Sequence, residues 1–326
     1  MRDVVLRTIE LAERDAVLDL LAEWYNDREF FARYLLHDPT FSPALCFVAE
    51  VEGRLVSTFQ VFRKAVRLDG TCLDVAGVGN VFTTAAYRGK GIASRLLQYG
   101  LAQLPEHDFD VSLLFAVRLG FYARLGYHSH LRYLVFLAPG ARPRLPERYR
   151  VRPFAAEDLP AVQAVYDTYC ACRRGTTVRT SDYWRAQLRY AGNPGEEFLL
   201  ATDADRVVAY ARATGLLDFY VITEYGYAPG HRDALLQLLL QHYLEGIQQW
   251  PGVVAQLAHE PEVLEALRQH GIADHRIDDV FWMWRIVSPE RLAEKLRTRP
   301  DALRPELLWR EILPPESSVY WISDRF

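Results

Sequence analysis

The sequence predicts an α/β (α+β) protein with two similar halves, each a mixed, mostly antiparallel sheet flanked by helices. In each half, strand-like hairpin patterns are followed by a segment with apolar residues at helical spacing. A Pro-rich stretch separates the halves, and a chain of 326 residues is long enough for two compact cores. Together these three observations give the fold class.

The first half is predicted to begin with a strand and an amphipathic helix, followed by a meander of strands and a longer helix. Gly53-Arg54 and Asp69-Gly70 indicate the turns of the meander, and Pro105 ends the longer helix. The predicted elements are strands at 4–10, 46–52, 55–68, 71–84, 111–117 and 131–137, and helices at 13–25, 92–104 and 121–125.

The second half repeats this order at an offset of 145 residues, as Gly126 and Gly271 illustrate, which indicates an internal duplication. Beyond it, the tail is predicted to be helical at 289–297 and extended at 319–322. We therefore expect a first domain at 1–140, a linker at 141–150, a second domain at 151–287 and a C-terminal tail at 288–326.

The composition is that of a folded protein, and it excludes several classes of partner. The net charge is -4 and no Lys/Arg-rich run appears, so neither nucleic acid nor a membrane is expected as a partner. A cytoplasmic protein is expected, because no apolar signal segment precedes the first strand. The four cysteines are expected to be reduced, and no metal site is expected because Cys170 and Cys172 lack a second ligand pair.

The most informative segment, at 78–97, is a strand, a basic glycine loop and a helix start. Gly89 and Gly91 allow positive φ and leave space where backbone amides approach a bulky anion. The helix that begins near Gly91 directs its unpaired N–H groups to the same place, and Arg88 and Lys90 add positive charge. The loop therefore predicts a pyrophosphate site, although it lacks the patterns of a P-loop or a Rossmann fold.

The run Arg88-Gly89-Lys90-Gly91-Ile92-Ala93 resembles motif A of the GNAT superfamily of N-acetyltransferases, Gln/Arg-x-x-Gly-x-Gly/Ala. The resemblance implies a GNAT fold with acetyl-coenzyme A (acetyl-CoA) as cosubstrate and no metal. It also implies that backbone amides hold the pyrophosphate and that strand residues pair with the pantetheine arm. The residues it assigns to the coenzyme are Val81, Phe82, Thr83, Arg88, Gly89, Lys90, Gly91, Ile92, Ala93 and Ser94.

The segment from Phe121 to Tyr127 is similar to the family's Phe-Tyr-x-x-x-Gly-Phe/Tyr pattern, which implies a catalytic role for Tyr122. A phenol placed there can protonate the departing thiolate of coenzyme A. Packing between helix and sheet is the alternative for Tyr122, and Tyr127 is expected in the core. His128 and His130 lie nearby, and we expect them to be packed or solvent-facing rather than catalytic.

The acceptor is expected to be an amine on a small molecule or a peptide, and the sequence leaves its identity open. A homo-oligomer is also left open. The first helices mix aromatic side chains with carboxylates, which suits a cationic amine but equally an ordinary helix pair. These residues are Trp24, Tyr25, Asp27, Glu29, Phe30, Phe31 and Tyr34.

The second half is expected to be a degenerate GNAT-like domain that helps to shape the acceptor cleft. At the 145-residue offset, the positions of Arg88, Gly91 and Tyr122 are occupied by Asp233, Leu236 and Leu267. An aspartate repels pyrophosphate, and leucine side chains fill the space that glycine leaves open.

Tandem GNAT folds with one degenerate half resemble the enhanced-intracellular-survival (Eis) type of acetyltransferase. Residues 281–287 are similar to that family's exit from the second domain, but the 39 residues after Val287 are too few for its third domain. In the Eis type the terminal carboxylate resembles a catalytic base, which makes Phe326 a candidate base here. The alternative is an ordinary surface terminus, with proton loss through water.

The function that these features imply is direct transfer of an acetyl group from acetyl-CoA to a primary amine. Two alternatives from other classes are a sensor that binds acetyl-CoA without turnover and an interaction scaffold that binds no coenzyme. Coenzyme binding separates the scaffold from the other two, and turnover separates the enzyme from the sensor.

Overall fold

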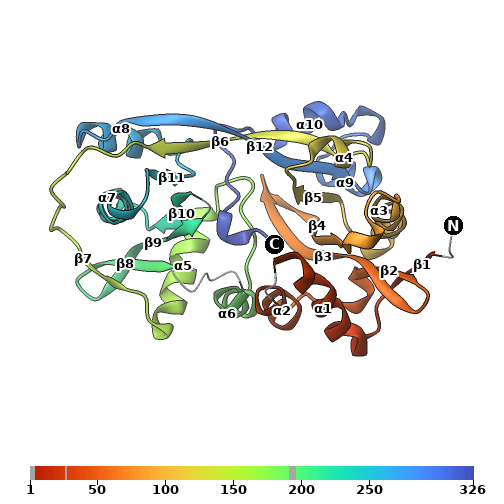
Figure 1. Cartoon of the computed structure of the whole chain (residues 1–326). Helices are drawn as coiled ribbons and strands as arrows, with labels where there is room; N and C mark the ends of the chain where they lie inside the picture. Colours follow the sequence, from red (N-terminus) through yellow and green to blue (C-terminus); the bar gives the residue numbers. More distant parts are fainter. Residues whose placement is uncertain (1–3, 26–27, 191–195, 217) are drawn as a thin grey trace.

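The computed structural model describes residues 4–25, 28–190, 196–216 and 218–326. Its strands form one twelve-stranded sheet in the order β1-β2-β3-β4-β5-β12-β6-β11-β10-β9-β8-β7. The sheet is mixed and mostly antiparallel, with parallel pairing between β4 and β5 and between β10 and β11. Helices flank it along its length (Figure 1). The predicted fold class is confirmed, but the two expected sheets are joined into one.

The elements of the first half follow the predicted order. One face of α3 is buried through the apolar residues Ile92, Leu96, Leu97 and Leu101, which recur at helical spacing. The elements are β1 (Val4–Thr8), α1 (Arg14–Tyr25), α2 (Arg28–His37), β2 (Cys46–Val51), β3 (Arg54–Leu68), β4 (Thr71–Thr83), α3 (Ile92–Gln103), β5 (Val111–Phe115), α4 (Leu119–Ala123) and β6 (His128–Leu137).

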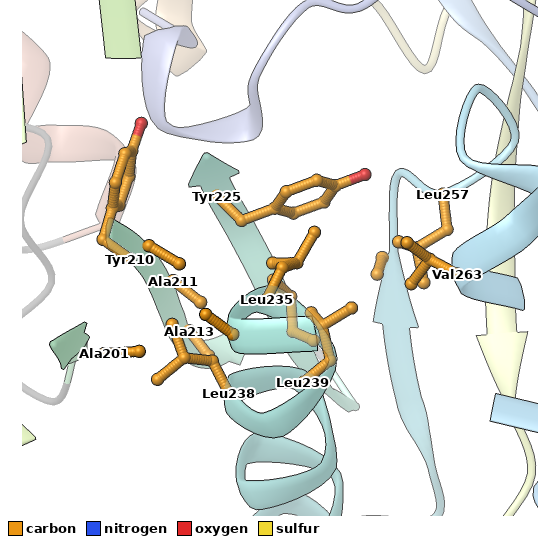
Figure 2. Packing of buried hydrophobic residues seen from close by; sticks show 14 of the residues in the cluster. Ala201, Tyr210, Ala211, Ala213, Tyr225, Leu235, Leu238, Leu239, Leu257 and Val263 are labelled. Atoms are coloured by element: carbon orange, nitrogen blue, oxygen red, sulfur yellow. The ribbon is translucent and has the colours of Figure 1, made fainter. Parts of the chain in front are cut away.

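The second half repeats the order, and its helix α7 is embedded in the core. Figure 2 shows the ring of Tyr225 above Leu235 of α7 and directed toward Leu257. The elements are β7 (Arg150–Pro153), α5 (Leu159–Cys170), α6 (Ser181–Tyr190), β8 (Glu197–Asp203), β9 (Arg206–Leu216), β10 (Phe219–Tyr227), α7 (Arg232–Gln249), β11 (Val253–Ala255), α8 (Pro261–Gln269) and β12 (Asp274–Ile286).

The two halves exchange their last strands. β12 of the second half pairs with β5 of the first, from Trp282 opposite Phe115 to Ile286 opposite Val111. β6 of the first half pairs with β11 of the second, and β6 and β12 pair with each other across the middle of the sheet. Figure 1 shows these two long strands spanning both halves. The proposed boundaries at 140 and 151 stay a prediction, since each half contributes a strand to the other's part of the sheet.

The tail after β12 packs mainly against the first half and then returns to the centre. It contains α9 (Pro289–Lys295), as predicted, and α10 (Pro305–Ile312), which the sequence analysis did not predict. The predicted extended segment at 319–322 is buried but forms no strand, and a 3-10 helix follows at Ile322–Asp324. The C-terminus then lies between the two halves, beside β3 and β4 (Figure 1).

Candidate active site

A wedge opens in the first half of the sheet where β4 and β5 diverge. Among the described residues, these two strands pair only at 75–77 with 111–113. β4 continues along β3 to Thr83, while β5 pairs with β12 on its other side along its whole length. Parallel strands that separate in this way leave backbone groups of β4 without a strand partner on one side, which is the kind of edge that an extended ligand can pair with. The predicted pantetheine residues Val81 and Thr83 lie on this edge.

The loop predicted to hold pyrophosphate connects β4 to α3 beside this wedge. Gly89 and Gly91 have φ of +74° and +76°, and an added Cβ at either would meet no atom within 4 Å. The first bond of α3 runs from the Arg95 amide to the Gly91 carbonyl at 3.1 Å. The amides of Ile92, Ala93 and Ser94 therefore precede the hydrogen-bonded turns of the helix and are available to an anion.

The two basic side chains of the loop contact the loop itself. Arg88 Nε donates to the carbonyl of Thr83 at 2.8 Å, and its guanidinium lies 5.4 Å from the ring centre of Phe82. Lys90 Nζ lies 4.9 Å from the ring centre of Tyr87. Both cations are at the exposed side of the loop, so they add positive charge there without occupying the helix N-terminus.

The chain end lies in the wedge. An added Cβ at Gly77 would meet ring atoms of Phe326 at 2.5 to 2.9 Å, and one at Gly79 would lie 3.3 Å from the terminal carboxyl carbon of Phe326. The ring also stacks on Phe62 at 5.3 Å and packs on Phe115 at 5.4 Å. These two glycines, which alternate on one face of β4, leave the space that Phe326 fills. The surface terminus considered as an alternative is therefore not what the structure contains.

Tyr122 lies on α4 and packs at the edge of the first core. Its ring is 6.1 Å from Tyr127 in an edge-to-face arrangement. Burial raises the pKa of Tyr122 to about 12, which keeps the phenol protonated at neutral pH and able to act as an acid. Tyr127 is buried, as predicted, and its hydroxyl forms a 2.6 Å hydrogen bond with Ser112 Oγ.

The two histidines near this segment lie on β6, which begins at His128 and not at the predicted residue 131. His130 is buried, and burial lowers its pKa to about 3, so it is neutral at physiological pH. That neither histidine is the base stays a prediction.

Aromatic residues of the first helices join the outer end of β4. Trp24 is 47% exposed and stacks on Phe82 at 6.0 Å and on Phe31 at 6.5 Å. Tyr34 packs edge-to-face on Phe62, which itself stacks on Phe326. Phe30 and Glu29 are exposed on α2. Asp27 and the side chain of Tyr25 lie outside the described residues.

The corresponding wedge in the second half is filled. β10 and β11 pair at 220–222 with 253–255, but Tyr225 Oη then bridges to the carbonyl of Gln256 at 2.8 Å. The rings of His259 and of Trp321 from the tail pack on Tyr225 at 5.9 and 4.8 Å. Three aromatic rings thus occupy the space that a coenzyme arm would need.

The constant offset of 145 residues between the halves fails at the loop after β10. The offset holds for α1 and α5, which begin at Arg14 and Leu159, but α7 already begins at Arg232. The counterpart of Gly91 is therefore His231, the residue before α7, and not Leu236, which lies inside that helix. The second half has only residues 228–231 where the first has 84–91, so it lacks room for the basic glycine loop.

The sequence patterns did not predict four residues near the chain end, because these residues contact one another across more than a hundred positions of sequence. Lys64, Arg179, Tyr183 and Asp324 form a buried cluster just behind the chain end. No motif marks them. Lys64 is a basic residue inside the largely apolar pattern of β3, whereas Arg179 lies in the loop before α6. In the described part of the chain, no His, Cys, Asp and Glu side chains are grouped as metal ligands, and no helix is long and apolar enough to span a membrane.

Comparison with known proteins bears on both the domain and the fold. Residues 5–129 match the family model of the acetyltransferase (GNAT) domain. No curated protein matches the sequence. A GCN5-related N-acetyltransferase from Anabaena variabilis is 16% identical, with a TM-score of 0.69 and coverage of 90% of this chain and 75% of that chain.

Two further solved structures share the fold. Eis1 from Mycobacterium abscessus is 17% identical, with a TM-score of 0.58 and coverage of 88% of this chain and 74% of that chain. The N-myristoyltransferase of Saccharomyces cerevisiae, solved with bound myristoyl-CoA, is 12% identical, with a TM-score of 0.55 and coverage of 87% and 83%. At these identities the likeness establishes the fold.

Proposed function

We propose that the chain is an acyltransferase that transfers an acetyl group from acetyl-CoA directly to a primary amine, because residues 5–129 match the acetyltransferase (GNAT) domain. The observation that carries this proposal is the open loop at Gly89 and Gly91, which lies between the wedge of β4 and the N-terminus of α3. An anion there meets free helix amides and two nearby cations.

The proposed coenzyme site uses the backbone more than side chains. Amides of the loop and of the first turn of α3 would hold the pyrophosphate, and the open edge of β4 near Val81 and Thr83 would pair with the pantetheine arm. This path leads the thioester into the wedge, where Tyr122 and the carboxyl group of Phe326 are the candidate catalytic groups. The second half would bind no coenzyme, since its wedge is filled and its loop is short.

The proposed chemistry is a single acyl transfer. The amine nitrogen forms the new C–N bond while the C–S bond of the thioester breaks. One proton passes from the neutral amine to the Phe326 carboxylate, and the departing thiolate takes a proton from Tyr122. Proton exchange with solvent then restores both groups. The tail supports this assignment because it brings the terminal carboxyl carbon to within 3.3 Å of a Cβ built on Gly79.

Calorimetric titration with acetyl-CoA tests the site. We expect one binding site per chain, and loss of binding in Gly91→Leu. Gly230→Leu is the matched control, because Gly230 has φ of +82° just before α7 and open space around it, so it bears the same backbone strain in the other half. Two sites per chain, or unchanged affinity in Gly91→Leu, would refute the assignment.

Turnover with a panel of amines tests the reaction. Binding without turnover would favour the sensor, and the absence of any binding would favour the scaffold. Because the yeast N-myristoyltransferase was solved with myristoyl-CoA, the panel should be run with acyl-CoA donors of increasing chain length. We expect the acetyl donor to have the highest kcat/KM, since the Phe326 ring fills the inner end of the wedge against Gly77.

A further inference from the structure

The last three residues of the chain are fixed by a buried cluster of charges. Asp324 is fully buried and receives two hydrogen bonds from Arg179, from Nε to Oδ1 at 3.0 Å and from Nη2 to Oδ2 at 2.9 Å. Arg179 is fully buried as well. A buried pair of this geometry holds its partners in one arrangement, because separating them would leave uncompensated charges in the interior.

The same arginine is fixed from its other side by the second half. Its Nη1 and Nη2 donate to the two carboxylate oxygens of Glu224 on β10 at 2.9 and 2.8 Å. Ser323 Oγ also donates to Glu224. Glu224 therefore fixes the orientation of Arg179 independently of the tail. Through Glu224 and Arg179, the consecutive tail residues Ser323 and Asp324 are attached to β10.

The first half supplies a second attachment. Lys64 of β3 donates from Nζ to Tyr183 Oη at 2.6 Å, and Tyr183 Oη donates to Asp324 Oδ1 at 3.1 Å. Lys64 is 2% exposed, and its Nζ lies 6.0 Å from the ring centre of Phe326. Asp324 thus joins a strand of the first half, a helix of the second half and the chain end.

We propose that Asp324, held by Arg179 and by the hydroxyl of Tyr183, is a positioning residue that sets the place of the terminal carboxylate in the wedge. This inference rests on the proposed function, in which that carboxylate is the base. Asp324 precedes Phe326 by two residues, which span about 7 Å in an extended chain. Because this link is short, a shift of Asp324 moves the terminal carboxylate by nearly the same distance. Without the anchor, the last residues would fray as chain ends usually do.

The test uses full-length chains with the wild-type terminus or with two added glycines. The variants are Tyr183→Phe and Asp324→Asn, and the control is Tyr210→Phe. Tyr210 is also a buried phenol of this cluster, but its hydroxyl donates to Glu224 at 2.7 Å and does not contact the tail. For each chain the unfolding midpoint, the Kd for acetyl-CoA and the kcat and KM for an accepted amine are measured.

With the natural terminus, we expect Tyr183→Phe and Asp324→Asn to lower kcat roughly tenfold to a hundredfold while the Kd for acetyl-CoA stays within about twofold, since an error of about 1 Å in placing a reacting group has effects of this size. Tyr210→Phe lowers the unfolding midpoint but keeps kcat. With two added glycines, kcat is low in every chain and Tyr183→Phe causes no further loss, because both changes displace the same carboxylate.

The outcomes separate the inference from the proposed function. If the glycine extension lowers kcat but Tyr183→Phe and Asp324→Asn behave like Tyr210→Phe, the terminal carboxylate remains the base and the positioning role is wrong. If Tyr183→Phe lowers kcat by the same factor with and without the added glycines, the positioning role is also wrong. If the extension leaves kcat unchanged, the terminal carboxylate is not the base, and the proposed chemistry fails together with this inference.

Discussion

The substitution Gly77→Ala tests whether the position of the terminal ring matters for catalysis. The added Cβ would lie 2.5, 2.6 and 2.9 Å from the Phe326 ring atoms Cζ, Cε1 and Cε2. Because carbon atoms prefer separations of about 3.5 to 4.0 Å, the ring must withdraw by about 1 Å. We expect a stability loss of about 1–3 kcal/mol from overpacking, and a loss in kcat of about a hundredfold because the carboxylate moves with the ring.

Steady-state kinetics with acetyl-CoA, together with urea unfolding, measures both effects. Gly100→Ala is the control, since its Cβ would lie 2.4 Å from Phe59 Cζ, a comparable clash in the same half. It should lower stability and spare kcat. A second check is Phe326→Leu in the Gly77→Ala chain, where the smaller side chain relieves the clash and should restore part of kcat. Wild-type kcat in Gly77→Ala, or no recovery in the double variant, would refute the reasoning.

Three further predictions concern single groups. Tyr122→Phe should lower kcat and leave the Kd for acetyl-CoA unchanged, and the wild-type rate should not fall at alkaline pH until near the Tyr122 pKa of about 12. Burial lowers the pKa values of His130 and His259 to about 3, below the unfolded value of about 6.5. Their contribution to stability is thus complete above about pH 6.5 and is lost as pH falls toward 3, and urea unfolding of His130→Phe should show a weaker pH dependence in that window. Glu224→Gln should cost about 3–5 kcal/mol in urea unfolding, because Arg179 and Arg212 lose a buried counter-charge.

The sequence was most informative where structure depends on neighbouring residues. The loop from Arg88 to Ala93 and the buried face of α3 follow from glycine conformations and helical period within some fifteen residues, and both are present. The Tyr122 segment and the turns at Gly53 and Gly70 are equally local. Whether these residues bind a coenzyme remains a prediction.

The exchange of β6 and β12 could not be predicted, because an apolar strand has the same pattern whichever neighbour it pairs with. Trp282 and Met283 indicate a buried strand, and nothing in that pattern favours β5 over a strand of their own half. The length of the loop before α7 was missed for a related reason. A constant offset takes no account of a shorter loop. It therefore paired Gly91 with Leu236, which lies inside α7.

The two wedges differ in what occupies them. The parallel pairing ends at Gly77 on β4 and at Ile222 on β10, but β10 has a register shift between Ile222 and Glu224 that β4 lacks between Gly77 and Gly79. Two residues farther along, the first half has Gly79 and the second half has Glu224. The absent side chain at Gly79 admits the chain end, whereas the carboxylate at Glu224 binds the arginine that holds Asp324. The second half thus uses Glu224 to hold the tail, whereas the first half leaves space at Gly79 for the chain end.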